Sequence, residues 1–177
     1  MRLQLLSDLH LESEEFEPEP APGAELLVLG GDIDSSWAGF ERFRGWPVPV
    51  LLVAGNHEFD QRELNYAWPA LAGHCLRLGI RLLERESLVL ADAHGRRIRF
   101  VATIRWADFD VFGLHQRDRA MRAASYFQRV MCATQHGEPF DAAAVRAQAL
   151  ACRAWLQAEL TRGEPCDATV VAAMGAD

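Results

Sequence analysis

The sequence lacks the features that mark membrane-spanning, secreted or zinc-finger proteins. No apolar run approaches the ~20 residues that a helix needs to cross a bilayer. The N-terminal stretch reaches an aspartate after too few apolar residues for a secretory signal, and no small-residue cleavage site follows. The 4 cysteines include no CxxC pair, so we expect buried free thiols rather than a zinc site or disulfides. These absences predict a cytoplasmic protein with no membrane contact.

An excess of basic residues is also missing. The formal net charge is −7, whereas a nucleic-acid surface needs clustered Lys and Arg to displace counterions. Arg117, Arg119, Arg122 and Arg129 fall in one predicted helix, where they are expected to form a solvated face. We therefore predict no nucleic-acid surface, and the sequence leaves the oligomeric state open.

What is present suits one globular α/β domain. The chain has 177 residues, of which 50% are hydrophobic and 24% charged, enough to bury a core without disulfides. No internal repeat or low-complexity linker divides it, so we predict a single domain over residues 1–177. The proline-rich acidic stretch Glu12–Glu25 is expected to be a solvated loop.

Three apolar runs organise the first part of the sequence. Val50–Val53 has no polar alternation, which is typical of a strand buried on both faces in a sheet covered by helices. Leu3–Leu6 and Leu26–Leu29 repeat this plan, and Arg2–Ser7 is predicted to be a central strand. Each run leads into a turn with polar, ligand-type side chains.

The rest of the chain alternates between helical and strand-like patterns. The periodicities predict, in order, a helical turn over Ser36–Arg44, a helix over Trp68–Leu78, strands over Ile80–Leu83, Ser87–Leu90 and Arg97–Thr103, helices over Leu114–Ala133 and Asp141–Thr161, and a strand over Ala168–Ala172. Gly79 is expected to end the first helix, and Asp141 to cap the last one.

The turns after the first three strands hold five residues with metal-ligand chemistry: Asp8, His10, Asp32, Asn56 and His57. Open α/β sheets place their sites beyond the C-terminal ends of the strands, so these side chains are expected to converge. A carboxylate and an imidazole two positions apart can hold one cation, and a carboxylate from a neighbouring strand can bridge to another. Taken singly, each residue has an ordinary alternative as a turn, a cap or a hydrogen-bonded side chain.

Three short blocks resemble, in order and approximate spacing, the first signature blocks of the calcineurin-like metallophosphoesterases. They are DLH at Asp8–His10, GGD at Gly30–Asp32 and GNHE at Gly55–Glu58, with a looser likeness over Ile104–Phe109. The resemblance implies a layered β-sandwich flanked by helices. It also implies a hydrolase of phosphomonoesters or phosphodiesters that uses two divalent metal ions and acts on a small phosphate-ester substrate.

The same resemblance assigns roles to individual residues. It implies that Asp8 and His10 hold a first metal and that Asp32 bridges both metals. Asn56 would hold the second metal, and His57 would contact the phosphate and assist the leaving oxygen while a metal-activated hydroxide attacks phosphorus. Mn, Fe, Co, Zn and Mg all suit such ligands, so the metal identity stays open.

Two further carboxylates, Glu58 and Asp34, are weaker candidates, expected to orient an imidazole rather than bind metal. The family usually supplies three more histidines, one after a strand like Thr169–Val171 and two in a GHxH block, and none of them is present in this sequence. Four other histidines have nothing in the sequence that aims them at the site: His74, His94, His115 and His136. We therefore expect impaired activity.

The missing blocks also predict that the last strands of the sandwich are lacking, which leaves an unpaired sheet edge or an exposed apolar face. A cropped chain, a broken reading frame and a natural short form would each produce this pattern. The alternative function is a non-catalytic module that binds a partner through the sheet edge or through the predicted helix Leu114–Ala133.

Overall fold

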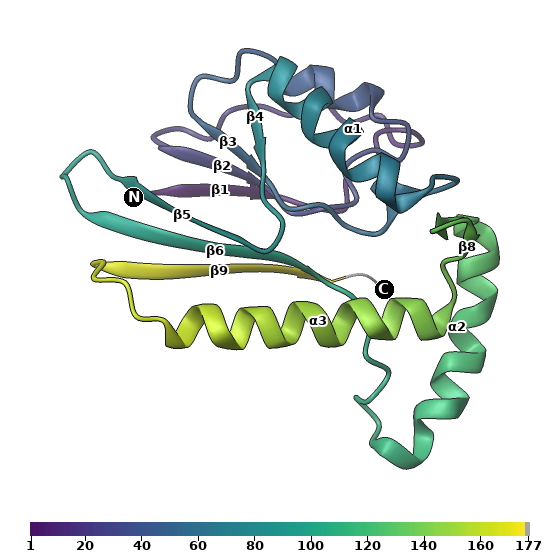
Figure 1. Ribbon diagram of the computed structural model, residues 1–177. Coiled ribbons are helices and arrows are strands. Elements are labelled where there is room, and N and C mark those ends of the chain that lie inside the picture. Colours follow the sequence, from purple (N-terminus) through teal and green to yellow (C-terminus); the bar gives the residue numbers. More distant parts are fainter. Residues whose placement is uncertain (176–177) are drawn as a thin grey trace.

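The computed structural model describes residues 1–175, apart from the side chains of 127, 128 and 175, and forms them into two facing sheets with helices outside (Figure 1). The first sheet is parallel, with the strand order β1-β2-β3-β4. Its strands are β1 (Leu3–Leu6), β2 (Leu26–Leu29), β3 (Val50–Leu52) and β4 (Ile80–Leu82). β2 and β3 are buried along their whole length, as strands covered on both faces should be.

Helical segments cover the outer face of the first sheet. They are the 3-10 helix η1 (Ala38–Phe43) and the helix α1 (Leu64–Leu78). Phe40 of η1 and Leu71 of α1 are fully buried in the same core cluster as Leu52 of β3. This packing holds the strands of the first sheet in place, and it therefore sets the positions of the loops that follow them.

The second sheet lies against the inner face of the first. It contains β5 (Glu86–Ala91), β6 (Arg97–Arg105) and β9 (Ala168–Gly175), with β5 antiparallel and β9 parallel to β6. Val28 and Leu51 of the first sheet pack with Phe100 of the second in one buried cluster. Helix α3 (Ala142–Thr161) runs along the outer face of this sheet (Figure 1).

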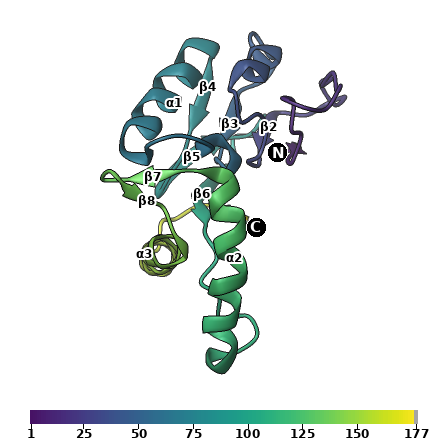
Figure 2. The ribbon, with the colours of Figure 1, turned by 90° about the vertical axis from the view of Figure 1, so that its right-hand side faces the viewer.

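A helical arm extends from the sheets. It comprises the 3-10 helix η3 (Leu114–Gln116), the helix α2 (Arg117–Met131) and a small hairpin of β7 (Thr134–Gln135) and β8 (Glu138–Pro139). α2 points away from the sheets in both views (Figures 1 and 2). Its C-terminal end returns to the body of the protein, where the N–H of Gln61 donates to the Met131 carbonyl at 2.6 Å.

Most of the predicted elements are confirmed, with three differences. Arg2–Ser7 is wrong as a central strand, because β1 is the outermost strand of its sheet and Leu5 is 61% exposed. α1 begins at Leu64, earlier than predicted, since the Glu63 carbonyl already accepts N–H groups of the first turn and Pro69 removes only its own donor. The β7–β8 hairpin is too short to show an alternation and was not predicted.

The predicted α/β class is confirmed, whereas the family-specific layering stays a prediction. Among the described strands, β1 and β9 are each outermost in their sheets, and Leu3 and Val171 are 41% and 44% exposed. That these edges result from missing last strands stays a prediction. Within residues 1–175, we find no helix with the length and apolar character that crossing a membrane requires.

Candidate functional site

The candidate site lies where the loops after β1, β2 and β3 meet. The loop after β1 runs along the loop after β2, since the N–H of Asp8 donates to the Gly31 carbonyl at 3.0 Å and that of His10 to the Asp32 carbonyl at 3.1 Å. The loop after β3 contacts the same residue, because the N–H of His57 donates to Asp32 Oδ1 at 2.9 Å. Asp32 therefore joins all three loops.

Three of the predicted site residues are brought together. His10, Asp32 and His57 each offer one ligand atom, and these atoms all lie within 4.8 Å of one another. The two imidazole rings meet edge to face, with centroids 5.0 Å apart and an interplanar angle of 73°. Asp32 is buried and both rings are partly exposed. A group of this composition and spacing could hold a metal ion through all three residues only when the His57 ring is neutral, and otherwise through His10 and Asp32.

Asp8 and Asn56 lie in the same loops as His10 and His57 but are not among the three residues that form this group. Burial raises the pKa of the Asp32 carboxyl, and the negative charge of Asp8 raises it further while the contacts with His57 oppose the rise. Asn56 is 4% exposed, and its Oδ1 has no hydrogen-bond partner among the described residues, while Nδ2 faces the sulfur of Met131 at 3.8 Å. A buried amide oxygen without a donor is costly, and a hard cation beside it would satisfy it.

The ring of His57 is held by a carboxylate that the sequence analysis did not assign to the site. Nδ1 of His57 lies 2.8 Å from Oδ2 of Asp60. This hydrogen bond, together with the charges of Asp60 and Asp32, raises the pKa of His57 to about 9 despite partial burial. The imidazole therefore carries a proton and a positive charge at neutral pH.

His10 has a similar partner, Glu12, with Nδ1 and Oε1 3.1 Å apart. Glu12 was predicted only as part of a solvated loop, and Asp60 was not among the predicted site residues. The available signal was a carboxylate two or three positions after each site histidine, a spacing that allows contact with the near ring nitrogen in a tight turn. Only the turn geometry, which the sequence did not specify, shows that the contacts form.

Glu58 and Asp34 were expected to orient an imidazole, and this expectation is wrong. Glu58 is fully buried and accepts three backbone N–H bonds, from Asp32 at 3.1 Å, from Ile33 at 2.7 Å and from Gly55 at 2.7 Å. Asp34 instead accepts the backbone N–H groups of Ser36 and Gly39. Both carboxylates accept hydrogen bonds from backbone N–H groups of the loops. These groups need side-chain partners because the loops turn too sharply for backbone carbonyls to reach them.

The backbone at the site is unusual. Asp8, His10 and Asp32 have φ angles of 53°, 45° and 51°, in the left-handed region that costs an ordinary residue about 1–2 kcal/mol. Gly31 has a φ of 76°, and a Cβ there would lie 2.6 Å from the nitrogen of Gly55. The loops after β2 and β3 therefore touch through their backbones.

Two of the four remaining histidines are engaged elsewhere. Nε2 of His74 lies 3.1 Å from the Trp37 carbonyl. Nδ1 of His136 lies 3.0 Å from Nδ2 of Asn65, next to the β7–β8 hairpin. Neither belongs to the group around Asp32.

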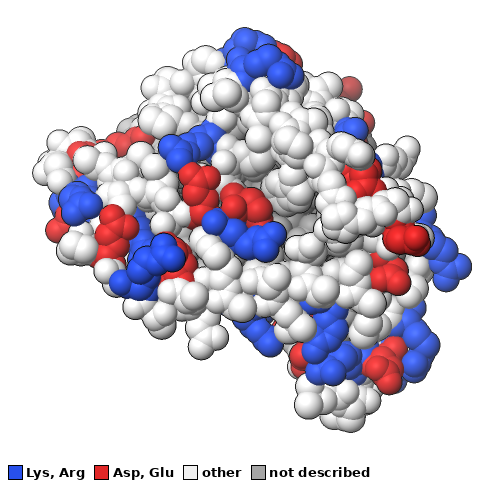
Figure 3. All heavy atoms as spheres, in the orientation of Figure 1, with Lys and Arg blue, Asp and Glu red and all other residues white. Residues whose placement is uncertain are grey.

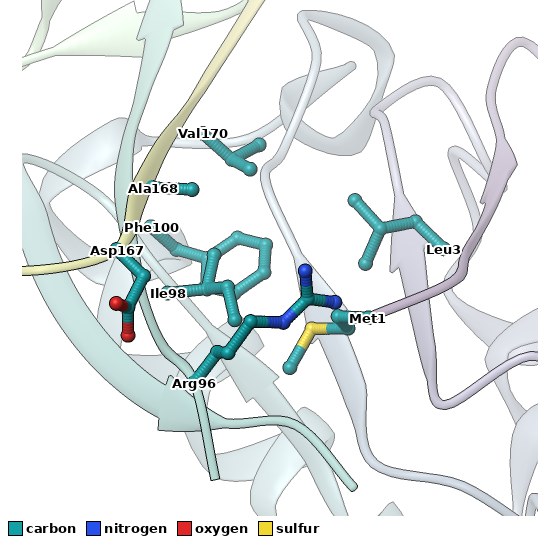
Figure 4. Close-up of a pocket in the computed structure, with 8 residues that line it drawn as sticks. All are labelled: Met1, Leu3, Arg96, Ile98, Phe100, Asp167, Ala168 and Val170. Carbon is teal, nitrogen blue, oxygen red and sulfur yellow. The ribbon is translucent and has the colours of Figure 1, made fainter. Parts of the chain in front are cut away.

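A separate cavity lies between the two sheets, at the end where β1, β6 and β9 begin. It has a volume of about 260 Å³. Figure 4 shows Met1 and Leu3 facing Ile98 and Phe100 across it, with Arg96 beside them. Because the site residues follow the opposite ends of the strands, this apolar space is distinct from the candidate site.

The charges visible on one face of the molecule form no single patch. On the described surface that Figure 3 shows, arginine side chains are interspersed with acidic ones, including over the arm at the lower right. This distribution gives no support to a nucleic-acid surface on that face, which needs clustered basic groups.

Comparisons with known proteins identify the fold but no family. No family model matches the chain, and no curated protein matches it in sequence. The structure is similar to that of phosphopantetheinyl hydrolase (PptH) from Mycobacterium tuberculosis, with a TM-score of 0.68 and 18% sequence identity. The match covers 96% of this chain and 66% of that one, so the chain spans just under two thirds of the solved structure.

The membership of the calcineurin-like metallophosphoesterases, inferred from three short blocks, is therefore corrected. The assignment is wrong on these findings, since no family model matches and the similar structure carries a different description at 18% identity. The blocks remain informative as residues, because one side chain from each of them, His10, Asp32 and His57, converges on the same point whatever family the chain belongs to.

Proposed function

We propose that this chain carries the site of a metal-dependent hydrolase of phosphate esters. The observation that carries the proposal is the convergence of His10, Asp32 and His57, whose ligand-type atoms lie within 4.8 Å of one another. Asn56, which precedes His57 in the sequence, has a buried amide oxygen without a hydrogen-bond partner among the described residues. Imidazole, carboxylate and amide oxygen together suit a divalent cation such as Mn, Fe, Co, Zn or Mg. The description of the similar structure as a hydrolase supports the reaction class at a coarse level.

In this proposal the metal ligands are Asp8, His10, Asp32 and Asn56. A bound cation would activate water and offset the negative charge of the phosphate. Asp32 would hold its place through its contact with the His57 N–H, and Asn56 through its burial beside Met131. Whether one or two cations bind depends on how many further donors reach the site.

His57 is proposed as the proton donor rather than as a metal ligand. Asp60 raises the pKa of His57 to about 9, so the ring carries a proton at neutral pH. A protonated imidazole beside the metal ligands can bind a phosphate oxygen and donate its proton to the leaving oxygen. Asp60 remains hydrogen-bonded to Nδ1 and keeps the ring in one orientation.

The test follows hydrolysis of an aryl phosphate as Mn²⁺ is titrated into the protein. Asp32→Asn is expected to abolish the Mn²⁺-dependent rate, and His57→Gln to lower kcat by about 10²–10⁴-fold, the usual contribution of a general acid. Asp118→Asn, the same change on the exposed part of α2, is the control and should leave the rate unchanged. Equal rates in the wild type and Asp32→Asn would remove the proposal.

A further inference from the structure

Glu12 contacts the site in a way that the proposed function does not use. Both of its carboxylate oxygens are engaged: Oε1 lies 3.1 Å from Nδ1 of His10, and Oε2 accepts the N–H of Ser35 at 3.0 Å. His10 follows β1, whereas Ser35 lies in the loop after β2 that also carries Asp32. One side chain therefore connects an imidazole of the site to the loop of its carboxylate.

The contact restricts the ring of His10 in two respects. An ionised carboxylate can only accept a hydrogen bond, so Nδ1 must carry the proton in the neutral ring. Nε2 is then the nitrogen whose lone pair is free to meet a cation. The bond also limits rotation of the ring, whose plane stands at 73° to that of His57.

We infer that Glu12 is a positioning residue, which holds His10 in the tautomer and orientation that a divalent cation needs when it also binds Asp32. The inference rests on the proposed function, because it takes His10 as a metal ligand. Hydrogen bonds from a ligating imidazole to a carboxylate typically change metal affinity by roughly 10–100-fold when they are removed.

Two simpler roles for Glu12 need to be separated from this one. Its negative charge lies near the site and could attract a cation without orienting His10. Its bond to Ser35 could also stabilise the two loops without any effect on the ring. Glu15 offers a matched control for the charge, because it is an exposed carboxylate of the same loop for which the described residues provide no side-chain hydrogen bond.

The experiment compares Glu12→Gln, Glu12→Asp and Glu15→Gln with the wild type. Mn²⁺ affinity is measured by calorimetry, and the tautomer of the neutral His10 ring is measured in the metal-free protein from long-range ¹H–¹⁵N NMR spectra. In Glu12→Gln, the amide oxygen can serve Ser35 while the NH₂ group donates to Nδ1, which moves the ring proton to Nε2. Circular dichroism verifies that each variant is folded.

Glu12→Gln is expected to shift His10 toward the Nε2–H tautomer and to weaken Mn²⁺ binding by roughly 10–100-fold. Glu12→Asp keeps the charge but is too short to bridge both partners, so it should lose part of the affinity and provide the second variant if Glu12→Gln does not fold. Glu15→Gln should match the wild type in both measurements.

The inference is overturned if Glu12→Gln keeps the Nδ1–H tautomer, whatever its affinity, or if Glu15→Gln loses as much affinity as Glu12→Gln. A wild-type protein that binds no Mn²⁺ would instead remove the proposed function. In that case the NMR measurement on the metal-free protein still decides whether Glu12 orients His10, so the two failures can be told apart.

Discussion

At the scale of single residues, the site depends on carboxylates that are not among the proposed metal ligands. Asp60 holds the ring of His57, and Glu58 accepts three backbone N–H groups from the loops that carry Asp32 and Gly55. Burial, and then the neighbouring charge of Asp32, raises the pKa of Glu58. Burial of the Glu58 carboxyl beside Asp32 is electrostatically unfavourable. Its oxygens offset this cost because they accept hydrogen bonds from buried backbone N–H groups of the loops.

The Asp60 contact leads to a pH-dependent prediction. In the metal-free protein, Asp60→Asn should lower the pKa of His57 from about 9 toward its ordinary value, because the largest cause of the rise is removed. A raised pKa stabilises the folded state below the ordinary value of about 6.5, and the benefit disappears as the pH rises through the folded-state value. The stability difference between wild type and Asp60→Asn should therefore be largest below about pH 6.5 and should fall to its minimum above about pH 9.

NMR titration of the His57 ring protons measures the pKa, and urea unfolding at several pH values measures the stability difference. Glu15→Gln removes one exposed negative charge that is not among those acting on His57, and it serves as the control for the change in net charge. An unchanged His57 pKa in Asp60→Asn would contradict the assignment of the hydrogen bond as its main cause.

At the scale of elements, the site is formed by contact between loops rather than by any helix. The turn after β2 meets the turn after β3 through backbone atoms, at a distance that leaves no room for a side chain on Gly31. Gly31 and Gly45 both have positive φ angles, but a Cβ on Gly45 would meet nothing within 4 Å. A comparison of alanine variants at the two glycines therefore separates the cost of a positive φ from the cost of crowding between the loops.

Gly31→Ala should destabilise the protein more than Gly45→Ala. Both variants carry the left-handed penalty of about 1–2 kcal/mol, and Gly31→Ala adds an overlap that typically costs about 1–3 kcal/mol. Urea unfolding gives the difference in free energy, and Mn²⁺ calorimetry shows whether the separated loops still bind metal. Equal losses in both variants would mean that the loops can move apart without cost.

The sequence predicted the strands well because β2 and β3 are unbroken apolar runs, which only a covered sheet can bury. It also predicted that residues following the strands would gather, since parallel strands end at a common edge. It could not predict Glu12 or Asp60 as imidazole partners, because those contacts depend on the backbone of the turns: His10 is left-handed, and His57 opens a short 3-10 helix that Asp60 caps at its C-terminal end. Nothing in the local sequence requires either conformation. The position of β1 at the sheet edge was likewise set by long-range pairing.

At the scale of the whole molecule, the two sheets leave adjacent apolar edges. Leu3 and Leu5 of β1 are 41% and 61% exposed, and Val171 of β9 is 44% exposed. The cavity lined by Met1 and Phe100 lies between the same strands (Figure 4). Free strand edges with exposed apolar side chains favour pairing with another chain. These edges therefore support the alternative function, in which the protein binds a partner instead of acting as an enzyme.

This feature predicts that Leu5→Gln lowers the binding of an apolar dye and the concentration-dependent light scattering of the protein. Leu76→Gln is the matched control, because Leu76 is 78% exposed on helix α1 rather than on β1 or β9. The effect of Leu5→Gln should be the larger one, since β1 also offers unpaired backbone groups. Equal changes in both variants, or none, would argue against the edge as an interaction surface.

The left-handed backbone at Asp8, His10 and Asp32 limits which substitutions can test the chemical role of a side chain without changing the loop. Alanine at Asp8 or Asp32 would remove a carboxylate and at the same time favour another loop shape, so a lost activity would have two causes. Asparagine tolerates this backbone conformation better than most residues and keeps the side-chain shape. Mutagenesis of these turns is therefore interpretable only with isosteric replacements, and an alanine scan would overstate the chemical importance of the two aspartates.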